Sequence, residues 1–294
     1  MANLKELRNR IASVKNTRKI TAAMSQIASA RLKKAQDAVM RARPYGDRMR
    51  EVIEQLVAGI AENDRAAAHP LLGTRPKIQR ALAIVVTSDR GLAGGFNANV
   101  VRAAKAWVDE QQHAGVAVEL VAVGKKAQSA LKHAKLPVRA NHDAPTLATL
   151  VPLSKTIVAD AITAFRGTSG EKADVVRLFF NEFVSVLTQK VKNDQLLPLA
   201  PGEDVKVVRE PTYEPSRGAI LEHLVPMAVE SRLQQAFFNS IAGEIAARRV
   251  AMDAATDNAS EMIADLTLLL NRERQAAITR ELMEIIGGAE ALKG

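Results

Sequence analysis

Both ends of the chain carry long stretches without the residues that break helices. Residues 3–43 contain neither glycine nor proline. Apolar residues recur there at the alternating spacing of three and four that is typical of a coiled-coil seam: Leu4, Leu7, Ile11 and Val14. This pattern predicts a helix from the beginning of the chain. The apolar residues then change phase before Ile20, Met24 and Ile27. A stutter or a hendecad stretch that locally relaxes the left-handed supercoil would accommodate this change.

Pro44 and Gly46 interrupt this first pattern, but the apolar spacing resumes over residues 49–60. Proline inside a long helix can bend it without ending it, so we expect a kink rather than a stop. Residues 61–77 are rich in Asn, Asp, Pro and Gly and are predicted to form a linker.

A second long stripe occupies the C-terminal part of the chain. After Gly218 only Pro226 and Gly243 interrupt a helical pattern that we expect to stop at Gly287–Gly288. The stripe consists of Leu233, Phe237, Ile241, Ile245, Met252, Ala255, Ala259, Ile263, Leu266 and Leu270. A helix of ~70 residues is ~105 Å long, which a small domain cannot cover. The two terminal helices are therefore predicted to pair in antiparallel fashion, with one end of the pair protruding.

The middle of the chain has a different period. Apolar runs at residues 81–86 and 116–123 predict buried strands, each followed by a helix, over residues 97–112 and to about residue 133. A helix over 154–166 then precedes a strand over 174–183, and residues 184–197 are expected to add an antiparallel edge strand. Alternating strands and helices predict a small, mostly parallel sheet with right-handed crossovers.

The predicted fold is therefore α+β. Long antiparallel N- and C-terminal helices, over residues 1–60 and 215–288, form a coiled coil, and a Rossmann-like α/β domain over residues 75–200 is inserted between them in the sequence, at one end of the pair. Residues 198–218, rich in proline and glycine, are expected to lead from the insert back to the second helix.

The composition excludes several kinds of site. There is no cysteine, which excludes disulfides and thiolate metal sites. The five histidines are scattered without a metal-ligand spacing, so no metal is predicted. No uncharged apolar run reaches the roughly 18 to 20 residues that span a bilayer, and the N-terminus lacks the apolar block of a signal peptide. We expect a chain that is neither secreted nor membrane-spanning.

The positive charge is concentrated at one end. Residues 1–50 hold 13 Lys and Arg against 3 Asp and Glu, a balance of +10, whereas the net charge of the whole chain is +9. Such a basic helix can be a solvated face, contact an acidic protein partner, or bind nucleic acid, although it lacks the aromatic residues typical of single-strand binders. Composition alone leaves these three interpretations open.

Two segments have the composition of possible sites. The loop Gly91–Gly95 follows a predicted strand and precedes a helix, where phosphate-binding turns occur, but its glycine spacing matches no nucleotide motif and a tight structural turn is the alternative. Ser88, Asp89 and Arg90 beside it are either catalytic residues or an ordinary polar loop. The polar segment 271–281 is either an exposed helix face or a helix whose whole circumference meets a surrounding protein.

Segments along the whole chain together resemble one family, the gamma subunits of F-type ATP synthases, which form a central rotor shaft. They are residues 4–24 (LKELRNRIASVKNTRKITAAM), 88–97 (SDRGLAGGFN), 254–258 (AATDN) and 274–282 (RQAAITREL). The resemblance implies a non-catalytic subunit with no cofactor, metal or nucleotide site, which couples ion-driven rotation of the membrane ring to ATP synthesis or hydrolysis on other subunits.

The resemblance also implies partners and contact residues. The paired helices would run through a hexamer of alternating alpha and beta subunits, and the insert would lie beside the epsilon subunit and the membrane c-ring, with no nucleic acid and no direct membrane span. Since the first motif begins almost at Met1, we expect a peripheral protein on the cytoplasmic face of a bacterial inner membrane. The expected beta-subunit contacts are Met24, Arg248, Arg274, Gln275 and Thr279, and the expected foot facing the ring and epsilon includes Tyr213 and Glu214.

Overall fold

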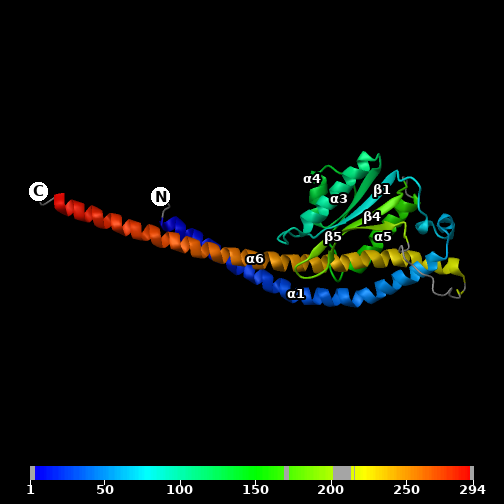
Figure 1. Cartoon of the computed structure of the whole chain (residues 1–294), viewed down its shortest axis with the longest axis horizontal. Coiled ribbons are helices and arrows are strands. Elements are labelled where there is room, and N and C mark those ends of the chain that lie inside the picture. Colours follow the sequence, from blue (N-terminus) through cyan, green and yellow to red (C-terminus); the bar gives the residue numbers. More distant parts are fainter. Residues whose placement is uncertain (1–3, 169–171, 201–212, 215, 292–294) are drawn as a thin grey trace. The chain divides into compact units, whose positions relative to one another are not determined.

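The computed structural model describes residues 4–168, 172–200, 213, 214 and 216–291 (Figure 1). It forms two compact units, which we call the terminal unit (Met1–Ala28 with Arg249–Gly294) and the central unit (Ser29–Arg248). Helices α1 (Leu4–Ala58) and α6 (Arg217–Ala291) contribute to both units. The domain division at residues 1–60, 75–200 and 215–288 stays a prediction, and most of the expected return segment 198–218 lies outside the described residues.

Helix α1 continues through Pro44, so the prediction of one helix rather than a stop is confirmed. The predicted phase change is wrong. The buried positions keep one heptad register along the helix: Leu7, Ile11, Thr21, Ser25, Ala28, Leu32 and Ala35. Ile20 and Ile27, which suggested the change, are 61% and 53% exposed. The seam was hard to recognise because small and hydroxyl-bearing residues occupy it, while larger apolar residues lie outside it.

Helix α6 contains the predicted stripe. Leu233, Phe237, Met252 and Ala259 are buried, and the other stripe positions are partly buried. The predicted stop at Gly287–Gly288 is wrong, because the helix continues to Ala291. Neither glycine adopts the positive φ that closes a helix, so the pair is accommodated in helical conformation.

The predicted linker contains short helical turns: η1 (Glu62–Asp64), α2 (Arg65–Ala68) and η2 (Pro70–Leu72). The side chain of His69 accepts a hydrogen bond from the backbone N–H of Leu71 at 3.2 Å and so caps η2. Leu71 and Leu72 are buried in the core of the central unit. The linker is therefore attached to the central unit through apolar packing.

A five-stranded sheet in the order β3-β2-β1-β4-β5 forms the middle of the central unit. Strand β1 (Arg80–Val86) pairs in parallel with β2 (Ala117–Val123) and β4 (Val175–Phe183), in the registers Arg80↔Ala117 and Ala81↔Val175. Strand β5 (Gln189–Leu197) pairs antiparallel with β4, which confirms the predicted edge strand. Strand β3 (Val138–His142), parallel to β2, was not predicted, because this short edge strand has no apolar run.

Each face of the sheet packs against helices, as the arrangement in Figure 1 shows. On one face Ala81, Ala83 and Val85 meet α3 (Phe96–His113) and α4 (Lys125–His133). On the other, Leu82, Ile84 and Val86 belong to a core with α5 (Leu150–Arg166), α6 and the end of α1. The alternation along β1 assigns successive side chains to opposite faces, and burial on both sides explains the continuous apolar run in the sequence.

A partly buried ion pair lies at the start of the sheet. Arg75 forms an ion pair with Asp174, and its guanidinium lies 4.9 Å from the ring centroid of Phe165. Asp174 also accepts hydrogen bonds from the backbone N–H groups of Gln79 at 2.7 Å and Arg80 at 3.0 Å. Burial raises the pKa of the Asp174 carboxyl, but these hydrogen bonds outweigh burial and hold the pKa below its ordinary value.

We expect Asp174→Ala to lower the free energy of unfolding by about 2 kcal/mol at pH 7, because it removes several hydrogen bonds to a charged acceptor. A carboxyl whose pKa is lowered by folding stabilises the protein above its unfolded pKa of about 3.9 and loses that effect as pH falls through the folded value. The difference in free energy of unfolding between variant and parent, measured by urea unfolding, should therefore decrease below about pH 4. A difference that stays constant down to pH 3, or an equal loss in the exposed control Asp109→Ala, would contradict this role.

Candidate functional site: the surface of the terminal helix pair

The terminal unit is held by an antiparallel contact between α1 and α6. The hydroxyls of Thr21 and Thr256 are 2.7 Å apart, and Ser25 donates a hydrogen bond to Asp253. Residue numbers on α6 fall as those on α1 rise, which confirms antiparallel pairing. Since hydroxyl groups replace larger apolar side chains at this part of the seam, hydrogen bonds between side chains specify the register there.

The same register places Leu4 opposite about residue 273, so α6 extends past the start of α1 from residue 274 onward, as Figure 1 shows. This extension has no described partner helix. It nevertheless carries large apolar side chains that are 50–67% exposed: Ile278, Leu282, Met283, Ile285 and Ile286. A single helix in water gains no tertiary packing, so such a surface indicates a binding partner.

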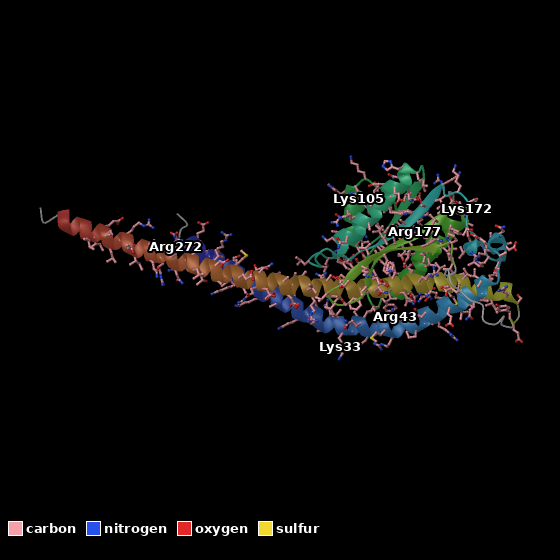
Figure 2. All side chains as sticks on the ribbon, in the orientation of Figure 1. Lys33, Arg43, Lys105, Lys172, Arg177 and Arg272 are labelled. Atoms are coloured by element: carbon pink, nitrogen blue, oxygen red, sulfur yellow. The ribbon has the colours of Figure 1, made fainter. Side chains whose placement is uncertain are left out.

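The structure divides the predicted beta-contact residues into two groups. Arg274, Gln275 and Thr279 lie exposed on the extension, and the Thr279 hydroxyl donates to the Gln275 carbonyl at 3.0 Å. Met24 is half-buried on α1, beside the seam residue Ser25. Figure 2 shows side chains projecting on both sides of α6 near Arg272, just before the extension. All four are accessible in the terminal unit, and their contact role stays a prediction.

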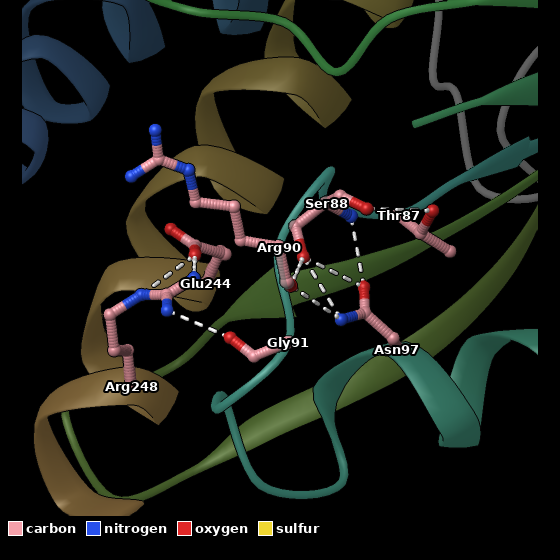
Figure 3. A network of polar contacts seen from close by, with 7 residues as sticks. All are labelled: Thr87, Ser88, Arg90, Gly91, Asn97, Glu244 and Arg248. Atoms are coloured by element: carbon pink, nitrogen blue, oxygen red, sulfur yellow. Dashed lines mark hydrogen bonds and ion pairs between the residues drawn. The ribbon is translucent and has the colours of Figure 1, made fainter. Parts of the chain in front are cut away.

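Arg248 has a different environment, in the central unit (Figure 3). Its guanidinium donates to the Gly91 carbonyl at 2.8 Å and to Glu244 at 3.0 Å, and its side chain is only 15% exposed. Arg248 therefore attaches the glycine-rich loop to α6. This intramolecular contact is the role that the structure gives it, and a direct contact with a beta subunit stays a prediction.

The glycine-rich loop lies at the carboxyl end of β1, where the strand order reverses and open α/β sheets commonly bind ligands. Here polar side chains hold the loop itself (Figure 3). The backbone N–H of Ser88 donates to Asn97 at 2.9 Å, and the Ser88 hydroxyl donates to the Arg90 carbonyl at 2.7 Å. Asp89 accepts from the backbone N–H groups of Lys125 at 2.9 Å and Ala144 at 3.0 Å. These contacts support the interpretation as a structural turn.

The loop presents Leu92 outward. Leu92 has a positive φ of 64° and is 62% exposed, and Arg90 beside it is also exposed. A left-handed backbone at a non-glycine residue costs about 1–2 kcal/mol, so the loop network keeps an apolar side chain at the surface in a strained conformation. No role for Leu92 was predicted from the sequence. The motif that contains it was recognised, but its backbone conformation has no sequence signal.

The two predicted foot residues differ in exposure. Tyr213 is half-buried and packs against the core of the central unit, with the Arg217 guanidinium 5.2 Å from its ring centroid. Its hydroxyl is buried without a hydrogen-bond partner in the described part of the chain. Glu214 is exposed. Glu214 is thus accessible, whereas the ring of Tyr213 mainly packs inward, and their assignment to a foot stays a prediction.

Within the described residues, no group of three or more His, Asp or Glu side chains is arranged to hold a metal ion. Among the same residues, no helix has an apolar stretch long enough to cross a bilayer.

Comparisons with known proteins agree with this architecture. A family model described as ATP synthase matches residues 3–292. The chain is 43% identical over 296 residues to the ATP synthase gamma chain of Geobacter sp. (strain M21), with 100% of both chains covered. The ATP synthase gamma chain of Geobacter metallireducens is likewise 43% identical over 296 residues, with 100% of both covered.

A structural comparison identifies the same fold. A chain in the structure of the Euglena gracilis mitochondrial ATP synthase, OSCP/F1/c-ring, superposes with a TM-score of 0.70 at 18% identity, covering 98% of this chain and 94% of that chain. A chain of the Tetrahymena thermophila mitochondrial ATP synthase central stalk and c-ring gives a TM-score of 0.56 at 21% identity, covering 80% and 99%. The predicted α+β fold class is confirmed. The chain belongs to the family of ATP synthase gamma chains.

Proposed function

We propose that the chain is the central rotor shaft of an F-type ATP synthase. It couples ion-driven rotation of a membrane c-ring to sequential conformational changes, and hence to ATP synthesis or hydrolysis, at sites held by alpha and beta subunits. The observation that carries this proposal is the extension of α6 from residue 274 onward, which exposes large apolar side chains along one side of a helix without a described partner. A surrounding ring of subunits would cover such a helix on all sides.

An asymmetric shaft would explain how rotation changes the conformation of each beta subunit. Its cross-section is asymmetric, because polar seam contacts and exposed apolar residues such as Ile20 and Ile27 occupy different faces of α1. Each of three beta subunits would therefore meet a different face and favour a different conformation. Rotation would change the affinity of each site for ADP, phosphate and ATP in turn, which is a population shift driven by differential contacts.

The residue assignments form part of this proposal. Met24, Arg274, Gln275 and Thr279 would contact beta subunits directly, whereas Arg248 would act through the glycine-rich loop that it holds. Tyr213 and Glu214 would belong to the foot that faces the epsilon subunit and the c-ring. The complex would lie on the cytoplasmic face of a bacterial inner membrane, with this chain as a peripheral subunit that does not span the bilayer.

Reconstitution with purified alpha and beta subunits tests the function. We expect a complex that contains this chain and hydrolyses ATP cooperatively. A chain that never assembles with them would contradict the proposal. The basic first helix motivates one alternative, a nucleic-acid-binding protein, which would instead bind DNA or RNA strongly and lose affinity steeply with salt. A nucleotide-dependent enzyme would require ATP or NAD to bind the isolated chain.

Met24→Lys tests the predicted bearing contact. An unpaired charge buried in an interface costs about 3 kcal/mol or more. The variant should therefore change the relative affinity of the shaft for the beta subunits at different rotation angles. We expect the ratio of ion pumping to ATP hydrolysis to fall in membrane vesicles, with hydrolysis largely retained. Met40→Lys, at a position in α1 that is 72% exposed, is the matched control. Unchanged coupling in Met24→Lys would count against the assigned position.

A further inference from the structure

A groove on the central unit has no part in the function proposed above. It lies between α3 and α4 and has a volume of about 600 Å³. Its apolar lining consists of small side chains: Ala98, Val101, Ala106 and Ala130. Because these apolar residues are small, another backbone can approach the helices closely where they lie. Helices pack at interaxial distances of 8–10 Å when the side chains between them are small enough.

Basic side chains line the same groove. Arg102 and Lys105 come from α3, where Figure 2 labels Lys105, and Lys126 comes from α4. None of these cations forms an ion pair within the described residues, and Arg102 donates only to Asn99, at 3.3 Å. One acid, Asp109, also lines the groove. The lining therefore combines an apolar floor of small side chains with an excess of unpaired positive charge.

We propose that this groove docks an acidic amphipathic helix of another protein chain. The apolar face of such a helix, with anchors at positions i, i+3, i+4 and i+7, would lie on the small residues of the floor. Its carboxylates would pair with Arg102, Lys105 and Lys126 at the rim, where electrostatic complementarity fixes orientation and favours association. A membrane surface fits less well, because the apolar residues are small and include none of the large side chains that insert into a bilayer. Nucleic acid fits less well, because the groove lacks aromatic side chains on which bases stack.

Photo-crosslinking locates the occupant. A benzophenone amino acid placed at Ala98, in the full chain and in its own cells, would react with whatever lies in the groove, and the adduct would be purified and sequenced. Thr156, on the exposed face of α5, is the control position. We expect an adduct from Ala98 and not from Thr156, and its peptide should be a helical segment with Asp or Glu beside an apolar stripe.

Charge reversal provides the second readout. The triple variant R102E/K105E/K126E should lower the adduct about tenfold, which corresponds to about 1.4 kcal/mol. K77E/K155E/K190E, with the same charge change at exposed positions outside the groove, should leave the adduct unchanged. The proposal is overturned by the absence of an adduct above the Thr156 control, by an adduct with lipid, nucleic acid or a peptide without an acidic face, or by equal effects of both triple variants. Assembly with alpha and beta subunits is measured separately, so a failure of the rotor proposal is distinguishable from a failure of the groove.

Discussion

Replacing Ile278, Leu282 and Ile285 by serine is expected to weaken assembly with alpha and beta subunits more than about hundredfold while leaving the isolated chain folded. Each of these side chains is at least 50% exposed in the chain alone, so its removal should change the free energy of unfolding by no more than about 0.5 kcal/mol. Burying one such side chain against a partner contributes about 1.5–3 kcal/mol, and each 1.4 kcal/mol is tenfold in affinity. Titration of labelled alpha–beta complex with the variant measures the loss.

A matched variant separates a specific surface from general hydrophobicity. Met40, Val184 and Leu187 are also large, apolar and 52–80% exposed, and they lie in the central unit. Serine at these three positions should leave assembly within about twofold of the parent, because the rotor proposal does not place them inside the ring. Equal losses in both triple variants, or no loss in the first, would contradict the assignment of the α6 extension as the enclosed part.

Gly124→Ala is expected to lower the free energy of unfolding by about 3–5 kcal/mol, because backbone strain and a steric clash act together. Gly124 has φ 92° and ψ 140°, a conformation that L-residues rarely adopt. A Cβ there would lie 2.8 Å from the carbonyl carbon of Thr87. Neither backbone can move easily, since the Thr87 N–H donates to Val123 at 2.8 Å and the Gly124 N–H donates to His142 at 2.8 Å.

Gly115→Ala is the control for this substitution. Gly115 also has a positive φ, 77°, but nothing lies within 4 Å of the position of an added Cβ. Gly115→Ala should therefore lower the free energy of unfolding only by the cost of the left-handed backbone, about 1–2 kcal/mol. Urea unfolding followed by circular dichroism compares the two variants. If both variants lose the same free energy of unfolding, the close approach of Thr87 and Gly124 is not what excludes a side chain at residue 124.

The fold was largely predictable where large apolar residues follow a regular period. The continuous runs that became β1 and β2 and the stripe on α6 are of this kind. The seam of α1 was misread because Thr21 and Ser25 occupy it, and hydroxyl groups are paired across the seam only when both helices are in place. Strand β3 was not predicted, because an edge strand can form without an apolar run. The helical conformation at Gly287 could not be read from composition, since glycine permits both a stop and a continuation.

The candidate site was predictable in part. The resemblance identified motifs, and Arg274, Gln275 and Thr279 proved exposed on the extension. The contact of Arg248 with the Gly91 carbonyl joins residues 157 positions apart in sequence, and no local pattern reports such a pairing. The exposed Leu92 has a positive φ, which leucine itself does not favour, in a loop held by the hydrogen bonds of Ser88, Asp89 and Asn97.

Observation of rotation tests the central claim most directly. Since the chain contains no cysteine, a single cysteine introduced at the exposed residue Gln112 gives the isolated chain one site for an optical probe before assembly. The complex with alpha and beta subunits would be fixed to a surface through the beta subunits and supplied with ATP. The rotor proposal predicts that the probe turns in one direction and pauses at three equivalent angles, one for each beta subunit. A probe that stays still while the same complexes hydrolyse ATP would contradict it.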